Sequence, residues 1–181
     1  MASPKRGGFS LSTRRLSSCR AQFAHTAAVC AGQPFLDTTT FWYDASWREI
    51  YLHSNVVGRM RANAAHNARV CFKVLESENF LPSNVALELL VQFRSVIAFG
   101  ALRVSEHGAD KERALYGLMR KYFSHYTVGA LIRPLTDKEL KRTSVYAIAI
   151  TEWSGQENWV ETVEQREVWA ELPTELLSAN E

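Results

Sequence analysis

Apolar and polar side chains alternate along much of this chain with a period of two, the pattern of strands that bury one face. The longest alternation covers residues 91–106, and Gly100 in its middle predicts a β-bulge or the close approach of another backbone. Residues 35–43 are rich in threonine and aromatic residues, which suit a half-buried strand. Six strands are predicted in all, at residues 21–30, 35–43, 49–54, 68–77, 91–106 and 143–153.

Three segments follow a helical period instead. Apolar residues three and four positions apart predict a short helix over residues 58–67 and a longer one over residues 110–126, with Asp110 as its N-cap. The segment from Thr136 to Glu139 has the form of a capping box and predicts another short helix. Because strands outnumber helices and several are joined as hairpins, the pattern predicts a mainly β fold, a six-stranded antiparallel barrel with peripheral helices.

The overall composition narrows the function classes. A length of 181 residues suits one domain with one core, and a formal net charge of +2 is too small to indicate nucleic-acid binding. The sequence has no run of about 18 apolar residues, so no membrane span is predicted. The cysteines are odd in number and form no C-x-x-C pair, which argues against a disulfide framework or a zinc site. A protein of the reducing cytoplasm is therefore expected.

The chain divides into three parts by composition. Residues 1–20 form a basic arm, residues 21–155 form the folded domain, and residues 156–181 form an acidic, tryptophan-rich tail expected to pack on the barrel or on a dimer partner. The basic, serine-rich start also has the composition of an organellar targeting peptide. We favour the basic arm, because the apolar pattern of a folded core begins at Phe23.

One cluster of residue types indicates a specific ligand. His53 and Ser54 end a predicted strand, and Arg59 and Arg61 begin the helix that follows. Hydroxyl groups, free backbone N–H groups at a helix start and arginine side chains together suit a phosphate. Thr38, Thr39 and Thr40 belong to the strand that we expect to pair with the His53 strand, so they would face the same ligand. The alternative is that both arginines are solvated and His53 is a hydrogen-bonded residue at a strand end.

A second candidate lies in the long strand over residues 91–106. Arg94 interrupts an apolar strand, where an arginine is costly unless it is paired or faces a ligand. Ser95 lies on the opposite face among apolar residues, where its hydroxyl needs a partner. The alternative is that Arg94 is on an exposed face, which the neighbouring Gln92 favours.

Other chemistries find no support in the sequence. It contains no G-x-S-x-G, H-E-x-x-H, P-loop or G-x-G-x-x-G motif, and its five histidines show no metal-ligand spacing. Cys71 falls in a predicted buried strand, so we expect it to be a core residue and not a nucleophile.

Several segments resemble the pyridoxamine 5′-phosphate oxidase-like FMN-binding proteins, in particular the branch related to nitroimidazole-resistance proteins. They are "GQPFLDTTTFWYD", "IYLHSNVVGRMRAN", "ARVCF", "FRSVIAFGALRV", "LMRKYF" and "RPLTDKELKRTSVYAIAITEWSG", in the order of the family and over roughly residues 23–155. The resemblance implies a split β-barrel that forms a homodimer, with FMN bound near the subunit interface.

The resemblance also assigns roles to individual residues. The strand around Asp37, Thr38, Thr39 and Thr40 would lie along the flavin, and His53 and Ser54 would lie near the ribityl-phosphate. Arg59 would bind the phosphate; Met60 stands where some relatives have a lysine, and Arg61 would compensate for it. Ser95 would approach the flavin with support from Arg94. Asp37 stands where relatives have an apolar residue, and it would disfavour a reduced anionic flavin.

The function implied is flavin-dependent oxidation or reduction of a small organic substrate. No general acid or base is predicted. Two alternatives remain open: a flavin-binding carrier or sensor without turnover, and a dimer of the same fold that has lost the cofactor.

Overall fold

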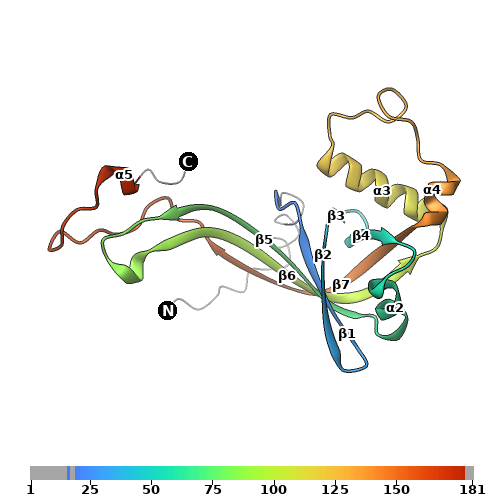
Figure 1. The fold of residues 1–181 in the computed structure, drawn as a ribbon, viewed down its shortest axis with the longest axis horizontal. Helices are drawn as coiled ribbons and strands as arrows, with labels where there is room; N and C mark the ends of the chain where they lie inside the picture. Colours follow the sequence, from blue (N-terminus) through green and yellow to red (C-terminus); the bar gives the residue numbers. More distant parts are fainter. Residues whose placement is uncertain (1–15, 17–18, 178–181) are drawn as a thin grey trace.

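The computed structural model describes residue 16 and residues 19–177, and these form a mainly β protein built on one antiparallel sheet (Figure 1). The strands occur in the order β2-β1-β5-β6-β7-β4-β3 across the sheet. They are β1 (Ala24–Cys30), β2 (Gln33–Thr39), β3 (Phe41–Asp44), β4 (Glu49–Asn55), β5 (Arg69–Leu81), β6 (Leu90–Ser105) and β7 (Thr143–Asn158). The described helices are α2 (Arg59–His66), α3 (Gly108–Tyr122), α4 (Asp137–Arg142) and α5 (Thr174–Leu177), with a 3-10 turn η1 (Ala86–Glu88).

The sheet curls into a split barrel because its two edge strands are consecutive in the chain. β2 and β3 lie at opposite edges of the sheet and are separated by Thr40 alone. At the bend, the hydroxyl of Tyr122 accepts a hydrogen bond from the Phe41 backbone N–H, 3.0 Å away, so α3 holds the chain where the ladder is interrupted. The predicted barrel with peripheral helices is confirmed, with seven described strands in place of six.

The extra strand corrects one prediction. Residues 35–43 were expected to be a single strand paired with the His53 strand, but β2 pairs with β1 and only β3 pairs with β4. The alternation of side chains continues through Thr40, so the sequence pattern does not show the bend. Thr38 and Thr39 therefore pair with His25 and Ala24, not with β4.

The barrel interior is filled by alternate residues of nearly every strand. Its core includes the fully buried Phe41, Ile50, Leu52, Phe72, Ala98 and Ile148. Met60 is also buried in this core, so α2 is anchored by one apolar side chain of its first turn. The predicted bulge at Gly100 is confirmed by a shift of the β6–β7 register between Phe99 and Gly100.

Helix α3 covers the outer surface of β3, β4 and β7 (Figure 1). Ala114 packs on Tyr51, Val145 and Ala147 in a second small core, and Trp42 lies at its border. The helix starts at Gly108 with His107 as its N-cap, so Asp110 is a residue of the first turn and not the predicted cap. A carboxylate in the first turn still favours this end of the helix, because it faces the positive end of the helix dipole.

The capping box predicted for α4 is confirmed. The Thr136 side chain accepts from the Glu139 backbone N–H, and the Glu139 carboxylate accepts from the Thr136 backbone N–H. None of the described helices is long and apolar enough to cross a membrane.

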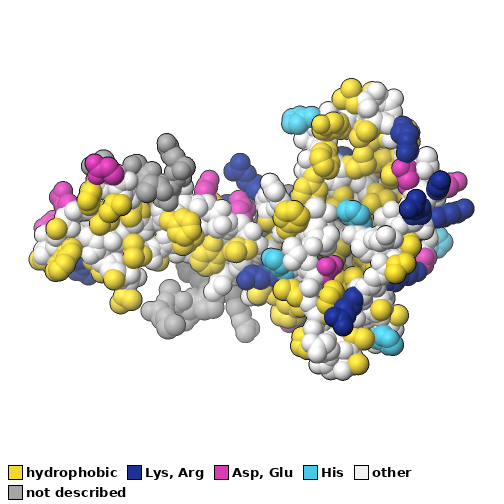
Figure 2. Space-filling view, in the orientation of Figure 1, with side chains coloured by type: hydrophobic (Ala, Val, Ile, Leu, Met, Phe, Trp, Pro, Cys, Tyr) yellow, Lys and Arg dark blue, Asp and Glu magenta, His cyan; other side chains and the backbone are white. Residues whose placement is uncertain are grey.

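Strands β5, β6 and β7 continue beyond the barrel as a long arm (Figure 1). The tail after β7 packs on this arm: Ser83 donates to the Glu164 carbonyl oxygen over 2.7 Å, and Gln92 donates to the Val160 carbonyl oxygen over 2.6 Å. The arm and tail still expose many apolar side chains (Figure 2), among them Phe80, Leu87, Leu89, Val168 and Trp169.

Candidate functional site

The N-terminus of α2 presents backbone N–H donors that no side chain of the described residues caps. Its N-cap is Gly58, which makes no side-chain cap, and no acidic residue lies in the first turn. A Cβ added to Gly58 would meet no atom within 4 Å, so the approach to these N–H groups is open. Arg59 is exposed, and its guanidinium lies 5.4 Å from the centre of the Phe35 ring, with no carboxylate partner among the described residues. An anion would therefore meet free N–H groups and one free positive charge here.

The next two residues of α2 have other contacts. The Met60 side chain is 4 % exposed within the core, so only its backbone N–H is available at the helix start. Arg61 donates to the Ser144 hydroxyl and to the Glu106 carboxylate, each over 3.0 Å. The charge of Arg61 is thus paired within the protein, and it is less available to a phosphate than that of Arg59.

His53 and Ser54 lie on opposite faces of β4, because consecutive strand residues alternate. Ser54 faces the barrel interior and its hydroxyl lies 3.1 Å from that of Tyr146. His53 lies beside Val145 on the other face, with Nδ1 buried and without a hydrogen-bond partner among the described residues. Burial lowers the pKa of His53, so the neutral imidazole is favoured. One ligand group would not contact both side chains through the same face of β4.

Strand β2 is an edge strand that pairs only with β1 within the described sheet. The outward backbone N–H and C=O groups of Asp37–Thr39 are therefore not used in a ladder. Thr38 Oγ1 lies 2.9 Å from Nδ1 of His25, on the outer face of the sheet. Asp37 is half-buried and lies opposite Thr26, whose buried hydroxyl has no hydrogen-bond partner among the described residues.

Arg94 and Ser95 are far from α2 along β6. Arg61 of α2 bonds Glu106, which directly follows the last residue of β6, Ser105. Ser95 is ten residues before Ser105, which corresponds to about 33 Å along the strand. Arg94 is on the face that carries the buried Val96 and Ala98, and its guanidinium lies 3.8 Å from the centre of the Trp159 ring and 3.7 Å from Glu157. Arg94 is therefore paired within the chain, by a carboxylate and a ring that follow it in β7 and the tail, although its side chain is still 40% exposed.

The outer face of β2, β1, β5 and β6 carries a row of apolar residues. Leu36, Ala27, Cys71 and Phe99 are neighbours across the four strands. Leu36 is 62 % exposed and Phe99 44 % exposed, and a hollow of about 550 Å³ lies on this face. Cys71 is half-buried on this outer face, so the prediction that it belongs to the core is wrong.

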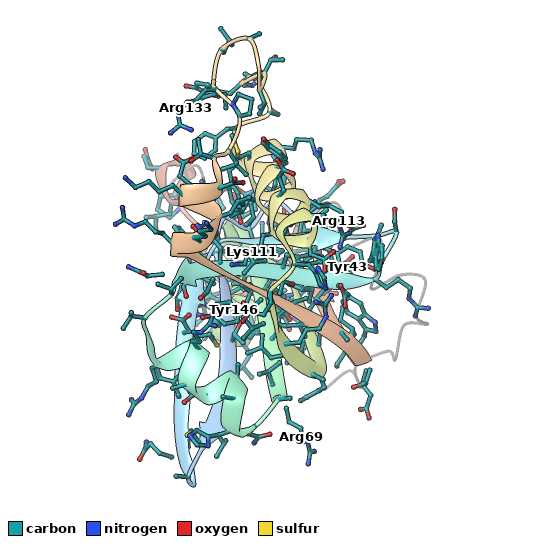
Figure 3. All side chains as sticks on the ribbon, turned by 90° about the vertical axis from the view of Figure 1, so that its right-hand side faces the viewer. Tyr43, Arg69, Lys111, Arg113, Arg133 and Tyr146 are labelled. Atoms are coloured by element: carbon teal, nitrogen blue, oxygen red, sulfur yellow. The ribbon has the colours of Figure 1, made fainter. Side chains whose placement is uncertain are left out.

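Three residues near the candidate site were not predicted. Ser144 and Tyr146 meet Arg61 and Ser54 because β7 lies beside β4, and His25 meets Thr38 because β1 lies beside β2. Figure 3 shows Tyr146 below α3 in the middle of the barrel. His25, Ser144 and Tyr146 all belong to strands whose alternation of side chains is ordinary, so only the order of the strands in the sheet could have revealed these contacts.

Among the described candidate residues, those at the N-terminus of α2 suit a phosphate best. The free N–H groups, the open space at Gly58 and the unpaired Arg59 are the donors that a phosphate ester requires. The edge of β2 adds backbone groups that could bond the rim of a flat heterocycle. The described residues contain no cluster of three or more His, Cys, Asp or Glu side chains suited to a metal ion.

The sequence matches one protein-family model, described as pyridoxamine 5′-phosphate oxidase, over residues 14–157. No curated protein matches the chain by sequence.

Solved structures share the fold at low sequence identity. A flavocytochrome of Azotobacter vinelandii is 21% identical with a TM-score of 0.69, over 87% of this chain and 71% of that one. A protein of Mycobacterium smegmatis that binds FAD and heme is 22% identical with a TM-score of 0.71, over 87% and 75% of the two chains. A protein of Bacteroides thetaiotaomicron described as a 5-nitroimidazole antibiotic resistance protein is 19% identical with a TM-score of 0.66, over 78% and 81%.

Proposed function

This chain belongs to the pyridoxamine 5′-phosphate oxidase family, and from that premise we propose that it binds FMN and catalyses flavin-dependent oxidation or reduction of a small organic substrate. The structural neighbours that bind flavins support the cofactor class. The choice of FMN rests on the site itself, where one helix N-terminus and one free arginine suit a single phosphate group.

The uncapped start of α2 is the observation that carries the proposal. Its N–H groups and the Arg59 guanidinium would hold the phosphate, and the Met60 side chain would hold the helix in place from the core. Arg61 would act indirectly: its bonds to Ser144 and Glu106 tie α2 to β7 and to the end of β6. The flavin, when bound, would supply the redox chemistry.

The remaining residues would orient the ring system and limit access to it. Free backbone groups at the edge of β2 would bond the rim of the ring next to Asp37, Thr38 and Thr39. The Asp37 carboxylate would oppose negative charge on a nearby flavin. His53, whose neutral form is favoured, lies on the outer side of β4, and its buried Nδ1 has no hydrogen-bond partner among the described residues.

A homodimer completes this proposal. The apolar row on the outer face would be covered by the same row of a second copy. In such a dimer, Ser95 of one copy would lie closer to the flavin held by α2 of the other copy than to the flavin held by its own α2. Leu36 and Phe99 are the most exposed residues of that row.

The test of the site is Arg59→Ala. Loss of one charged contact to the phosphate should cost about 1.5–3 kcal/mol, or roughly 10- to 150-fold in FMN affinity. The affinity is measured by quenching of flavin fluorescence on titration with apoprotein, and FAD is titrated in parallel. Arg142→Ala, an exposed arginine of α4, is the matched control. An unchanged FMN affinity in Arg59→Ala would refute this site.

Turnover is tested separately from binding. The flavin-loaded protein is mixed with NADH or NADPH in air, and consumption of the nicotinamide is followed by absorbance. Steady consumption that depends on bound flavin supports an oxidoreductase. Tight FMN binding without consumption of any electron donor would favour a carrier or sensor.

A further inference from the structure

A second hollow lies between residues 19–22, β3 and the last turns of α3, with a volume of about 720 Å³. It shares no residue with the flavin site proposed above. Three of its lining residues are basic, namely Arg20, Arg120 and Lys121, and none of the described residues that line it is acidic. The described part of its wall is therefore positively charged, with no carboxylate to balance it.

Lys121 is the residue of this hollow with the least satisfied side chain. Its Nζ is buried and has no hydrogen-bond partner among the described residues. It lies 3.0 Å from the centre of the Phe41 ring and 4.9 Å from that of Tyr122. Burial lowers the pKa of Lys121 to about 8. The two rings attract the ammonium only partly, so a buried lysine here lacks the counter-charge that its ionised form requires.

Trp42 is an aromatic residue that also lines the hollow. Trp42 lies directly against Gly117 of α3, where any Cβ would overlap the indole ring. Trp42 also stacks on Tyr51, with ring centres 5.6 Å apart and planes 28° apart. The indole is thus held between a helix and a strand, and the Arg120 guanidinium lies 5.9 Å from its centre. A flat ligand could pack against the part of Trp42 that lines the hollow, with an acidic group near the basic side chains.

We propose that this hollow is a binding site for a small planar organic anion, such as an aromatic carboxylate. The carboxylate would be the counter-ion of Lys121 and Arg120, and the ring would contact Trp42. This inference goes beyond the proposed function, because it requires no flavin. An inorganic anion would satisfy the charge but would leave the aromatic wall unused.

The test compares two probes of similar size and shape, of which one carries a negative charge and the other is neutral. Isothermal titration calorimetry with the full-length protein measures binding of 4-hydroxybenzoate and of the neutral 4-hydroxybenzamide. The anion should bind at least tenfold more tightly than the amide, and Lys121→Met should remove that preference. Lys138→Met, which removes an exposed lysine of α4, is the matched control and should change nothing. Equal binding of the two probes, or an unchanged preference in Lys121→Met, would overturn the proposal.

Two further readouts separate this site from a general structural effect. Arg120→Gln should weaken the anion at least severalfold if Lys121→Met does not fold, and an unchanged affinity in Arg120→Gln would count against the site. Arg59→Ala should leave binding of 4-hydroxybenzoate unchanged, and displacement of the anion by FMN would show that there is no separate site.

Proton uptake gives the most direct test of the role of Lys121. At pH 8 the anion should draw up to about half a proton onto the amine, measured from binding enthalpies in buffers of different ionisation enthalpy. The other titratable or charged groups near the amine are Cys19, Tyr43, Tyr122, Arg20 and Arg120, with Glu76 near Cys19. Lys121→Met should abolish the uptake, and uptake that persists would assign it to one of those groups and refute the proposal.

Discussion

At the scale of single residues, the contacts of a side chain decide its role more than its type does. Arg59 and Arg61 lie two positions apart in one short helix, and the sequence treats them alike. Arg61 is held by Ser144 and Glu106, while the contact of the Arg59 guanidinium within the described part of the chain is with the Phe35 ring. The register of β7 beside β4 places Ser144 under Arg61, and sequence spacing does not contain that information.

Gly100 is required by packing in the β6–β7 ladder. A Cβ at this position would lie against the carbonyl oxygen of Ala149, which belongs to the backbone and has little room to move. We expect Gly100→Ala to lower the free energy of unfolding by about 1–3 kcal/mol, measured by urea denaturation. Gly108→Ala is the control, since a Cβ there meets nothing within 4 Å. Equal stability of the two variants would contradict the close approach.

A polar network under α3 depends on Arg113. This side chain donates to the Asp44 carboxylate and to the Tyr51 hydroxyl, and Tyr51 donates to Glu49 over 2.5 Å. Figure 3 shows Arg113 between α3 and the strands beneath it. Burial, with the bond to Glu49, raises the pKa of Tyr51 to about 12, so the hydroxyl stays protonated below that pH.

We expect Arg113→Met to destabilise the fold by about 1.5–3 kcal/mol, because Asp44 is 7 % exposed and would lose its counter-charge. The measurement is urea denaturation at pH 7, with Arg142→Met as the control. The double variant Asp44→Asn/Arg113→Met should be less destabilised than the sum of the two single changes. Additive effects would show that the pair is not coupled.

At the scale of elements, α4 is the segment whose start the sequence predicted most directly. Thr136 and Glu139 form the capping box, and Arg133 pairs with the same carboxylate over 2.7 Å. Hydrogen bonds from Arg133 and then from Thr136 lower the pKa of Glu139 to about 2, from an ordinary value of 4.5. The stabilising contribution of Glu139 is therefore complete above about pH 4.5 and is lost as the pH falls toward 2.

Thr136→Ala should weaken α4 by about 1 kcal/mol, because the first N–H groups of the helix lose their acceptor. Amide hydrogen exchange of residues 137–142 measures the local effect, and Thr127→Ala, an exposed loop threonine, is the control. Exchange in α4 should also accelerate between pH 4.5 and pH 3 relative to β4, after correction for the intrinsic rate. Unchanged exchange in Thr136→Ala would show that tertiary contacts alone hold the helix.

The bend between β2 and β3 could not be predicted from the alternation of side chains. Residues 35–43 keep one alternation of side chains, yet the ladder changes partner at Thr40. The hydroxyl of Tyr122 bonds both the N–H and the carbonyl oxygen of Phe41 and so replaces the missing strand neighbour. Tyr122 is 81 residues away in the chain, so no local pattern could predict this contact.

At the scale of the whole molecule, the proposed homodimer predicts the effect of one surface change. Phe99→Glu places a charge at the β6 end of the outer apolar row, where it would be buried without a partner in a dimer. We expect the variant to elute as a monomer, with the mass measured by light scattering after gel filtration. Leu131→Glu, at an apolar loop residue that is 71 % exposed, should leave the dimer intact.

A wild-type protein that is monomeric at all concentrations would contradict the dimer. A dimer that persists in Phe99→Glu would instead indicate that another surface, such as the exposed arm, joins the two copies. FMN titrations of Phe99→Glu test the link between assembly and cofactor: weaker binding by the monomer is expected if the site lies near the interface.

The sequence by itself determined the fold class, the family, the bulge at Gly100 and the α4 cap, because periodicity, turn residues and capping patterns are local properties of a chain. It also placed Arg59 and Arg61 at the start of α2. The tertiary structure alone decided which charges are free, which face His53 and Ser54 take, and where β2 meets β1. It also created the basic hollow around Lys121. These features depend on strand order and on contacts between residues far apart in the chain, which no local pattern encodes.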